Sequence, residues 1–365
     1  MKQEIRKIAL LTGGGDCPGL NAVLRAITRT AILKQGYEVI GYKYGYRGLY
    51  NNEYIPMNTH TVSGILHKGG TILYTSNKDN LFQYPFEEDG VTVYKDVSDK
   101  AIENMKREGV DVLVVLGGDG TLTSARDFAR KGFNVIGVPK TIDNDLVGTD
   151  ITFGFQSAVN VCVDALDKLH TTAESHQRIM VLEVMGRNAG WIALHSGIAG
   201  SADIILLPEI PYDIEKIVHK IKKRTLSGKP FSNIVIAEGA KPIGGDIVVQ
   251  RTVEDSPDPI RLGGVSFALA AELEKHITDS EVRCTVLGHL QRGGIVSAYD
   301  RLLCTRLGVA AVEMIQKRNF GQMVSIKGNS ISSESLEKIG GATRTVPTTD
   351  ELIHVARSIG ISFGN

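Results

Sequence analysis

Residues 111–121 read DVLVVLGGDGT, an apolar run that leads directly into a glycine turn. The run from Val112 to Leu116 contains only valine and leucine, which is typical of a strand buried on both faces of a sheet. A helix is predicted after the turn, from about Thr121 to Arg130. The stretch therefore predicts a strand, a turn and a helix, the repeating unit of an α/β fold.

The same alternation extends to both sides of this stretch. Two successive α/β units with parallel strands and right-handed crossovers are predicted, which suits a chain of 365 residues. Ligands of such sheets bind beyond the carboxyl ends of the strands. The other predicted strands are 7–12, 37–42, 134–139, 179–185, 202–208 and 232–240. The other predicted helices are about 21–35, 99–108, 157–169, 212–224 and 265–278. The polar stretch 241–261 is predicted to be a surface excursion.

Composition and charge exclude several classes of protein. The chain has 41 basic and 41 acidic residues, so it has no overall attraction for nucleic acid or an anionic membrane. Its four cysteines lie far apart without zinc spacing, which predicts reduced, buried thiols. No segment approaches the roughly 20 apolar residues of a membrane helix, and the apolar start is too short for a signal peptide. A cytoplasmic protein is expected.

Two glycine loops follow predicted strands and open predicted helices. Backbone N–H groups in GGGDCPGLN (13–21) and at the start of the next helix suit a phosphate group. In GGDGT (117–121), the glycines let a polyphosphate approach, and Asp119 puts a carboxylate where Mg²⁺ would bridge phosphate oxygens. The second loop also resembles one in NAD kinases and lipid kinases. Together the loops predict phosphate chemistry without naming the acceptor.

A third segment supplies acid–base chemistry. PKTIDND (139–145) follows the strand at 134–139 and contains a lysine, a hydroxyl and two carboxylates. If the segment is extended, Asp143 and Asp145 point to the same face. A sugar hydroxyl must lose its proton as it accepts a phosphoryl group, and one of these aspartates can accept that proton.

Five segments in order carry a resemblance to one family. They are GGDCPGLN (14–21), GGDGT, PKTIDND, HQRIMVLEVMGRNAGWIA (176–193) and LGHLQRGG (287–294), and together they resemble the phosphofructokinase family. The resemblance implies two similar Rossmann-like α/β domains with mainly parallel sheets and the active site in the cleft between them. It implies a donor domain of residues 1–154 plus 291–341, and a sugar-phosphate domain of residues 155–290 plus 342–365.

The resemblance also implies the reaction: the γ-phosphoryl group of ATP passes to the 1-hydroxyl of fructose 6-phosphate, in glycolysis. Asp143 would be the base, and Arg187 would stabilise the charge of the transferring group. Asp119 would bind Mg²⁺. The other residues implied to bind the phosphoryl donor are Gly15, Asn77, Lys78, Gly118, Gly120 and Thr121. Thr141 and Asp145 would act in catalysis with Asp143 and Arg187. The sugar would be bound by Ile142, Met185, Gly186 and Glu238.

The 6-phosphate would bind to Arg178, Arg283, His289 and Arg292, with Leu290 and Gln291 in the same segment. In the family, the equivalents of Arg178 and Arg283 come from a neighbouring subunit, so the resemblance implies a homodimer or homotetramer. Arginine suits this task because its planar fork matches phosphate oxygens.

The donor is the open question within this chemistry. Pyrophosphate users of the family resemble GGDD, whose second aspartate excludes ATP, and this chain has Gly120 there. Lys140, however, resembles the pyrophosphate users, and Asn77 stands where common ATP enzymes have an arginine. Gly120 favours ATP, with a pyrophosphate-dependent enzyme as the alternative. A kinase for NAD or lipid, and a non-catalytic member of the fold, are two further hypotheses, which PKTIDND and the presence of Asp143 and Arg187 disfavour.

Overall fold

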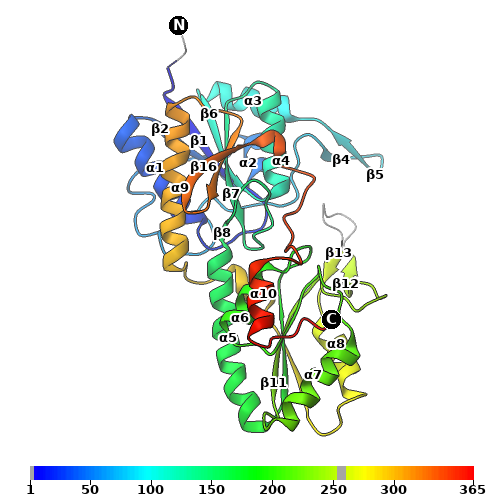
Figure 1. Cartoon of the computed structure of the whole chain (residues 1–365). Helices are drawn as coiled ribbons and strands as arrows, with labels where there is room; N and C mark the ends of the chain where they lie inside the picture. The colour runs from blue at the N-terminus through cyan, green and yellow to red at the C-terminus, as the bar shows by residue number, and fades with distance from the viewer. Residues whose placement is uncertain (1–3, 253–259) are drawn as a thin grey trace. The chain divides into compact units, whose positions relative to one another are not determined.

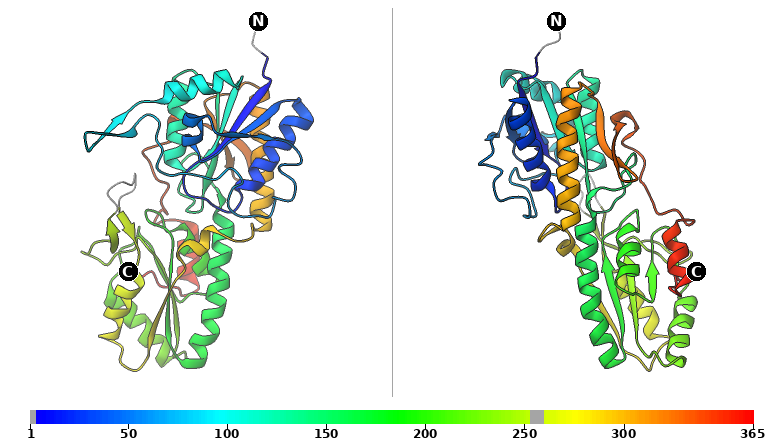
Figure 2. Two further views of the ribbon diagram at one scale, coloured as in Figure 1. Left: turned by 180° about the vertical axis from the view of Figure 1, so that it is seen from behind. Right: turned by 60° about the vertical axis from the view of Figure 1, so that its left-hand side comes forward.

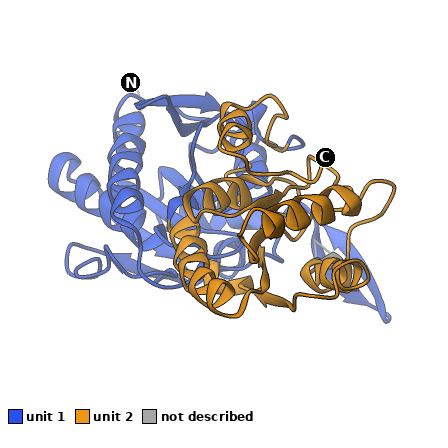
Figure 3. Ribbon diagram, turned by 60° about the horizontal axis from the view of Figure 1, so that its bottom comes forward, with its two compact units in different colours: residues 1–142, 146–156, 292–342 blue, residues 143–145, 157–291, 343–365 orange. Residues whose placement is uncertain are grey.

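The computed structural model describes residues 4–252 and 260–365 (Figure 1). The chain divides into two compact units, coloured separately in Figure 3. Unit 1 contains residues 1–142, 146–156 and 292–342, and unit 2 contains residues 143–145, 157–291 and 343–365. Compared with the division expected from the sequence, residues 143–145 belong with unit 2.

Unit 1 is built on one mainly parallel sheet. The strand order is β16-β15-β7-β6-β1-β2-β3, with β8 paired to β7, and only the β2–β3 and β15–β16 pairs are antiparallel. The strands are β1 (Lys7–Thr12), β2 (Glu38–Tyr42), β3 (Tyr54–Met57), β6 (Val112–Gly117), β7 (Val135–Thr141), β8 (Phe153–Gly154), β15 (Gln322–Lys327) and β16 (Ser330–Ser335). A separate hairpin joins β4 (Tyr84–Glu88) to β5 (Val91–Lys95).

The helices of unit 1 bury their apolar residues against this sheet. They are α1 (Leu20–Thr30), a π-helical turn at Ala31–Gln35, α2 (Tyr46–Asn51), α3 (Ser98–Arg107), α4 (Asp119–Arg130), α9 (Ala298–Gln316) and a 3₁₀ turn at Leu336–Lys338. Leu113 and Val115 of β6 share a core with α3 and α4. Helices α1 and α9 pack side by side (Figure 2). They can approach closely because Gly308 has no Cβ: a Cβ there would lie only 2.6 Å from Ala26 Cβ.

Unit 2 contains a smaller, fully parallel sheet of order β10-β11-β9-β14. Its core is apolar, and Trp191 is 5% exposed. The strands are β9 (Ile179–Val184), β10 (Ile204–Leu206), β11 (Ser232–Ala237) and β14 (Val282–Val286), with a hairpin of β12 (Val249–Thr252) and β13 (Ile260–Leu262). The helices are α5 (Phe155–His176), α6 (Trp191–Ala199), α7 (Ile214–Leu226), α8 (Val265–Glu274), a 3₁₀ turn at Gly288–Arg292 and α10 (Glu351–Ser358).

The predicted fold class, mixed α/β with mainly parallel sheets, is confirmed. The end of one helix was predicted wrongly. Helix α5 was expected to end near residue 169 but continues to His176, because no glycine or proline stops it before Gln177, which adopts a left-handed φ of 54°. The stretch 241–261, expected to be a surface excursion, contains strand β12 and part of β13; residues 253–259 lie outside the described residues.

Two statements about the sequence can be compared directly with the described part of the chain. The four cysteines are all free thiols, as predicted, and Cys17, Cys162 and Cys304 are buried, whereas Cys284 is only partly buried. Among the helices described, none combines the length and the apolar character needed to span a bilayer.

Candidate active site

The loop after β1 lies against the loop after β6 in unit 1. The N–H of Gly13 donates to Leu116 O at 3.0 Å, and a Cβ at Gly13 would lie 2.6 Å from Thr121 Cγ2. Only a glycine backbone fits this approach. The structure therefore brings together the two glycine loops that the sequence predicted to hold phosphate.

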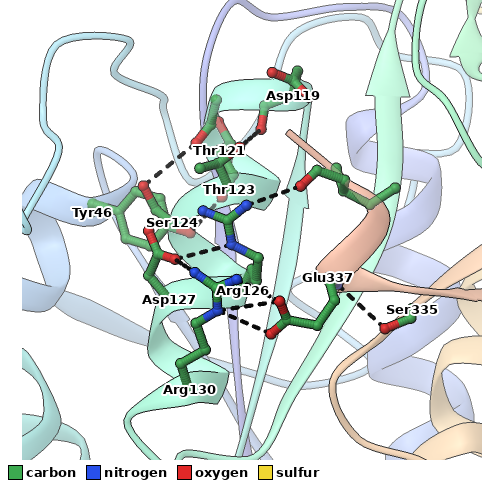
Figure 4. A network of polar contacts seen from close by, with 12 residues as sticks. Tyr46, Asp119, Thr121, Thr123, Ser124, Arg126, Asp127, Arg130, Ser335 and Glu337 are labelled. Carbon is green, nitrogen blue, oxygen red and sulfur yellow. Dashed lines mark hydrogen bonds and ion pairs between the residues drawn. The ribbon is translucent and has the colours of Figure 1, made fainter. Parts of the chain in front are cut away.

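The second loop leads into the N-terminus of α4. A Cβ at Gly117 would lie 2.3 Å from Thr121 Cβ, so the turn also needs glycine there. The first turn of the helix is fixed because the Tyr46 hydroxyl donates to Thr121 O at 2.8 Å (Figure 4). At Gly120, in contrast, a Cβ would meet nothing within 4 Å. The helix start is thus closely packed on one side and open at Gly120.

Asp119 is the first residue of α4 and is accessible to solvent. Desolvation by the surrounding protein raises the pKa of its carboxyl group, and the backbone N–H groups of Gly340 and Gly341 oppose that rise. The segment that contains these glycines is bound to α4, since Arg126 Nη1 donates to Ile339 O at 3.2 Å (Figure 4). The carboxylate expected to bind Mg²⁺ is therefore presented beside the open helix start.

Lys140, the penultimate residue of β7, is 4% exposed. Its Nζ donates to Gly15 O at 2.6 Å and would lie 3.3 Å from a Cβ at Gly14. Because the lysine is held so close to the loop, its positive charge acts directly on any anion there. Lys140 and Gly15, both predicted site residues, are in contact.

Arg292 lies at the same loop. Its Nη1 donates to Asp16 O at 3.1 Å and would lie 2.9 Å from a Cβ at Gly15. Arg292 belongs to unit 1, whereas Arg178, Arg283 and His289, predicted to bind the same phosphate, belong to unit 2. Within unit 1, Arg292 therefore adds a second positive charge to the loop.

The segment 75–78 borders the loop from another direction. Gly14 N donates to Ser76 O at 2.9 Å, and Thr75 Oγ1 donates to Gly14 O at 2.6 Å. Asn77 and Lys78, predicted to bind the donor, follow directly and are exposed. Their side chains are thus available beside the loop.

An aromatic stack next to this segment was not predicted. The rings of Tyr44 and Tyr74 lie parallel, with centroids 5.1 Å apart, and the guanidinium of Arg47 lies 4.8 Å from the Tyr44 ring. Both tyrosines have left-handed backbones, with φ of 58° and 56°, a conformation that is costly outside glycine and concentrates at functional sites. The sequence offers one signal, the run of tyrosines at 42–50, which alone does not distinguish a stack from core.

In PKTIDND, the chain leaves β7 through a tight turn. Thr141 ends the strand, its carbonyl accepts from Thr152 Oγ1 at 2.7 Å, and Ile142 is fully buried. Asn144 is 4% exposed and has a φ of 52°, so the segment is not extended and the alternation expected for Asp143 and Asp145 does not apply.

The carbonyls of this turn are held by an arginine that sequence reasoning missed. Arg344 Nη1 donates to Asn144 O at 2.9 Å, and the backbone N–H of Arg344 donates to Asp145 O at 2.8 Å. Arg344 lies in the unremarkable stretch TRTVP (343–347), which carries no motif that could have identified it.

In unit 2, two predicted site segments meet at the ends of neighbouring strands. Glu238 follows β11, and its N–H donates to Val184 O, the last residue of β9, at 2.9 Å. A Cβ at Gly239 would lie only 1.9 Å from Arg187 O. The structure therefore places Glu238 next to the loop of Met185, Gly186 and Arg187.

Gln291 supports this loop from inside the protein. Its side chain is fully buried, with Oε1 accepting from Met185 N at 3.1 Å and Nε2 donating to Gly288 O at 3.0 Å. His289 and Leu290, its neighbours, are exposed. Within the predicted substrate-binding segment 289–292, Gln291 therefore holds the backbone of Met185, whereas His289 is exposed to solvent.

Arg178 and Arg283 are brought together by one carboxylate. Arg178 Nε lies 2.6 Å from Glu281 Oε2, and Arg283 Nη2 pairs with Glu281 Oε1. The two guanidinium groups predicted to bind the sugar phosphate therefore form one cluster at the surface of unit 2, with an acidic partner that sequence reasoning missed.

Comparison with known proteins gives this geometry its context. Residues 7–315 match the family model described as phosphofructokinase. The chain belongs to the phosphofructokinase family. It is 67% identical to the ATP-dependent 6-phosphofructokinase 2 of Clostridium perfringens, with all of both chains covered. It is 46% identical to the ATP-dependent 6-phosphofructokinase of Chloroflexus aurantiacus, over all of this chain and 99% of that one.

The family includes a relative with another donor in its name. The pyrophosphate–fructose 6-phosphate 1-phosphotransferase of Streptomyces coelicolor is 44% identical, over 98% of this chain and all of that one. Overall identity at this level does not separate the two donors, because it is close to the 46% of a relative named for ATP. The donor has to be argued from particular residues.

Solved structures agree on the fold. The phosphofructokinase of Saccharomyces cerevisiae matches with a TM-score of 0.77 and 31% identity, over 91% of this chain and 45% of that longer chain. The pyrophosphate-dependent phosphofructokinase of Nitrosospira multiformis matches with a TM-score of 0.81 over 98% of this chain and 92% of that one. At 21% identity, that second likeness concerns the fold alone.

Proposed function

We propose that this chain is an ATP-dependent 6-phosphofructokinase, which transfers the γ-phosphoryl group of ATP to the 1-hydroxyl of fructose 6-phosphate. The observation that carries the choice of donor is the open space at Gly120, where an added Cβ meets nothing within 4 Å. A nucleotide needs that space beyond its β- and γ-phosphates, and pyrophosphate does not. The 67% identity to a full-length relative named for this reaction supports the same donor.

The aromatic stack also favours a nucleotide. Tyr74 is 54% exposed, lies flat on Tyr44 and directly precedes Thr75, which bonds Gly14. A flat, exposed aromatic surface beside a phosphate loop can stack on a purine base. Pyrophosphate has no base to place there.

Mg²⁺ would be bound at the donor site by the carboxylate of Asp119. Within residues 4–252 and 260–365, no group of three His, Cys, Asp or Glu side chains could hold a metal ion by itself. One carboxylate beside a phosphate loop fits Mg²⁺, because this ion keeps several waters and takes its other ligands from substrate phosphates. When bound, it would neutralise charge on the donor phosphates.

The protein groups then divide the remaining work. Lys140 places positive charge at the loop that would receive the polyphosphate. Arg292, which donates to Asp16 O, would bind the 6-phosphate of the sugar. Asp143 would accept the proton of the 1-hydroxyl, and Asp145 and Thr141 would orient the acceptor. Arg187 would stabilise the negative charge of the transferring group. Glu238, packed next to that arginine's loop, would accept hydrogen bonds from sugar hydroxyls.

Assignment of the units follows from these groups. Unit 1 contains the two glycine loops, Asp119 and Lys140, and would bind the donor. Unit 2 contains Arg187, Glu238 and the Arg178–Arg283 pair, and would bind the sugar phosphate. The cytoplasm remains the expected location.

We further propose a homo-oligomer in which Arg178 and Arg283 serve a neighbouring subunit. Both arginines lie at the surface of unit 2. In unit 1, Ile295, Tyr299 and Leu302 around the start of α9 are 74%, 50% and 64% exposed, and a group of large apolar side chains at the surface suits a subunit interface.

The deciding experiment measures fructose 1,6-bisphosphate formed from fructose 6-phosphate and Mg²⁺, with ATP in one sample and pyrophosphate in another. Turnover with ATP and not with pyrophosphate is expected. Turnover with pyrophosphate alone would mean that Lys140 and Asn77 outweigh the open space at Gly120, and the enzyme would be the pyrophosphate-dependent alternative.

A further inference from the structure

The turn that carries Asp143 contains a residue with a left-handed backbone. Asn144 has a φ of 52° and is 4% exposed, and this conformation is uncommon outside glycine, although asparagine adopts it more readily than most residues. The residue follows Asp143 directly, so a change in its backbone would rotate the Asp143 carboxylate. Contacts that hold the backbone of Asn144 therefore also hold the direction of that carboxylate.

Arg344 is placed to do this. It donates to two consecutive carbonyls, from Nη1 to Asn144 O at 2.9 Å and from its backbone N–H to Asp145 O at 2.8 Å. Because one residue donates to two successive peptide groups, it fixes the orientation of both peptide planes. The bond to Asn144 depends on the guanidinium group, and the bond to Asp145 does not depend on the side chain.

Arg344 is itself held at two points by Trp191, the first residue of α6. The guanidinium carbon lies 4.2 Å from the centroid of the indole ring, and the indole Nε1 donates to Arg344 O at 2.9 Å. Stacking on an aromatic face uses the planar guanidinium in a way that a lysine cannot reproduce. Helix α10, which follows Arg344 in the chain, packs against α6.

We infer that Arg344, held by Trp191, is a positioning residue that orients the Asp143 turn for catalysis. This inference rests on the proposed function, in which Asp143 is the base. Arg344 acts through the backbone of Asn144 and Asp145, so it contributes to turnover and not to the binding of either substrate. A displacement of about 1 Å in a reacting group can lower turnover about a hundredfold.

The first test compares Arg344→Ala with the wild-type enzyme in steady-state kinetics. A fall in kcat of about 10- to 100-fold is expected, with each KM changed less than about threefold. Arg344→Lys keeps the charge but loses the stack and the fork, so an intermediate kcat is expected. Arg357→Ala is the matched control, because Arg357 of α10 also lies over an aromatic ring, that of Phe363, but contacts Asn365 instead of the turn.

A double-mutant comparison separates positioning of the base from a general structural role. If Arg344 acts through Asp143, then Arg344→Ala should lower the residual turnover of Asp143→Asn by less than about threefold. An equal proportional loss in both backgrounds would overturn the inference. So would a normal kcat in Arg344→Ala.

Two further readouts do not need activity. Trp191 is the single tryptophan of the chain, so its fluorescence reports directly on the loss of the Arg344 stack. Hydrogen exchange of the peptide that covers residues 141–146 should become faster in Arg344→Ala and remain unchanged in Arg357→Ala. If the wild type forms no fructose 1,6-bisphosphate from either donor, the proposed function fails, yet these two measurements still decide whether Arg344 holds the turn.

Trp191→Phe provides a second variant if Arg344→Ala does not fold. It keeps an aromatic face but removes the bond from Nε1 to Arg344 O. In this variant, kcat should fall less than in Arg344→Ala, and hydrogen exchange in residues 141–146 should be faster than in the wild type. Wild-type values for both would overturn the role given to Trp191 and Arg344.

Discussion

Lys140 Nζ donates a hydrogen bond of 2.6 Å to the carbonyl oxygen of Gly15, which joins the end of β7 to the loop after β1. The lysine is 4% exposed, so this contact is made in an environment where charge is poorly screened. It links the residue that resembles pyrophosphate users to the loop expected to bind the donor. Lys140 therefore has a structural role in unit 1 whichever donor is used.

Lys140→Met tests that role, because methionine retains the packing but removes the charge and the donor. A rise of about tenfold in the KM for the donor is expected. The free energy of unfolding should fall by about 1–3 kcal/mol, since the carbonyl of Gly15 loses its partner. Chemical denaturation and kinetics measure both. Lys131→Met is the control, as Lys131 pairs with Asp99 at the surface; equal effects in the two variants would contradict the prediction.

Gly120→Asp tests the basis of donor choice. The protein should fold normally, because a Cβ at this position meets nothing within 4 Å and an acidic residue in the first turn of a helix is favourable. Turnover with ATP should fall about a hundredfold or more, while pyrophosphate turnover should rise or stay unchanged. Gly120→Ala, which adds bulk without charge, should retain most ATP turnover. Full ATP turnover in the aspartate variant would show that donor choice lies elsewhere.

Tyr74→Ala tests the aromatic stack on Tyr44. Removal of the exposed ring should raise the KM for ATP about 5- to 10-fold, because stacking contributes about 1 kcal/mol. The KM for fructose 6-phosphate should not change. Tyr94→Ala is a suitable control, because Tyr94 of β5 is 66% exposed and takes no part in this stack. An unchanged KM for ATP would remove the stack from the donor site.

Asp143→Asn tests the base. Loss of the proton acceptor should lower kcat by about 10²- to 10⁴-fold, and substrate binding should change little. Kinetics together with thermal unfolding measure this, and the unfolding temperature should stay close to that of the wild type. Near-normal turnover would remove Asp143 as the base.

Mixing two inactive variants tests whether the site is shared between subunits. Arg283→Ala would lack a proposed ligand of the sugar phosphate, and Asp143→Asn would lack the proposed base. If Arg283 serves a neighbouring subunit, subunits of the two variants that are dissociated and reassembled together should form some sites that are intact. Recovery of up to about a quarter of wild-type turnover is then expected. No recovery from a mixture shown to contain hybrid oligomers would place Arg283 in its own subunit's site.

Much of the fold and of the candidate site could be predicted from the sequence, because both depend on local patterns. The run from Val112 to Leu116 is typical of an interior strand, and Gly117 must be glycine because the turn after that strand leaves no room for a Cβ. This local pattern of strand, glycine loop and helix predicts that Asp119 lies at the start of a helix, as it does in α4.

What only the tertiary structure decided is which distant groups meet. Three contacts show this, because each joins residues far apart in the chain or residues outside any motif. Arg292 lies next to Gly15, Glu281 lies between Arg178 and Arg283, and Arg344 contacts the turn of Asn144. No periodicity or motif encodes these contacts, since they depend on how separate elements pack and on where long side chains reach. The sequence by itself determined the fold class and the chemical groups, and the packing determined which residues hold those groups in position.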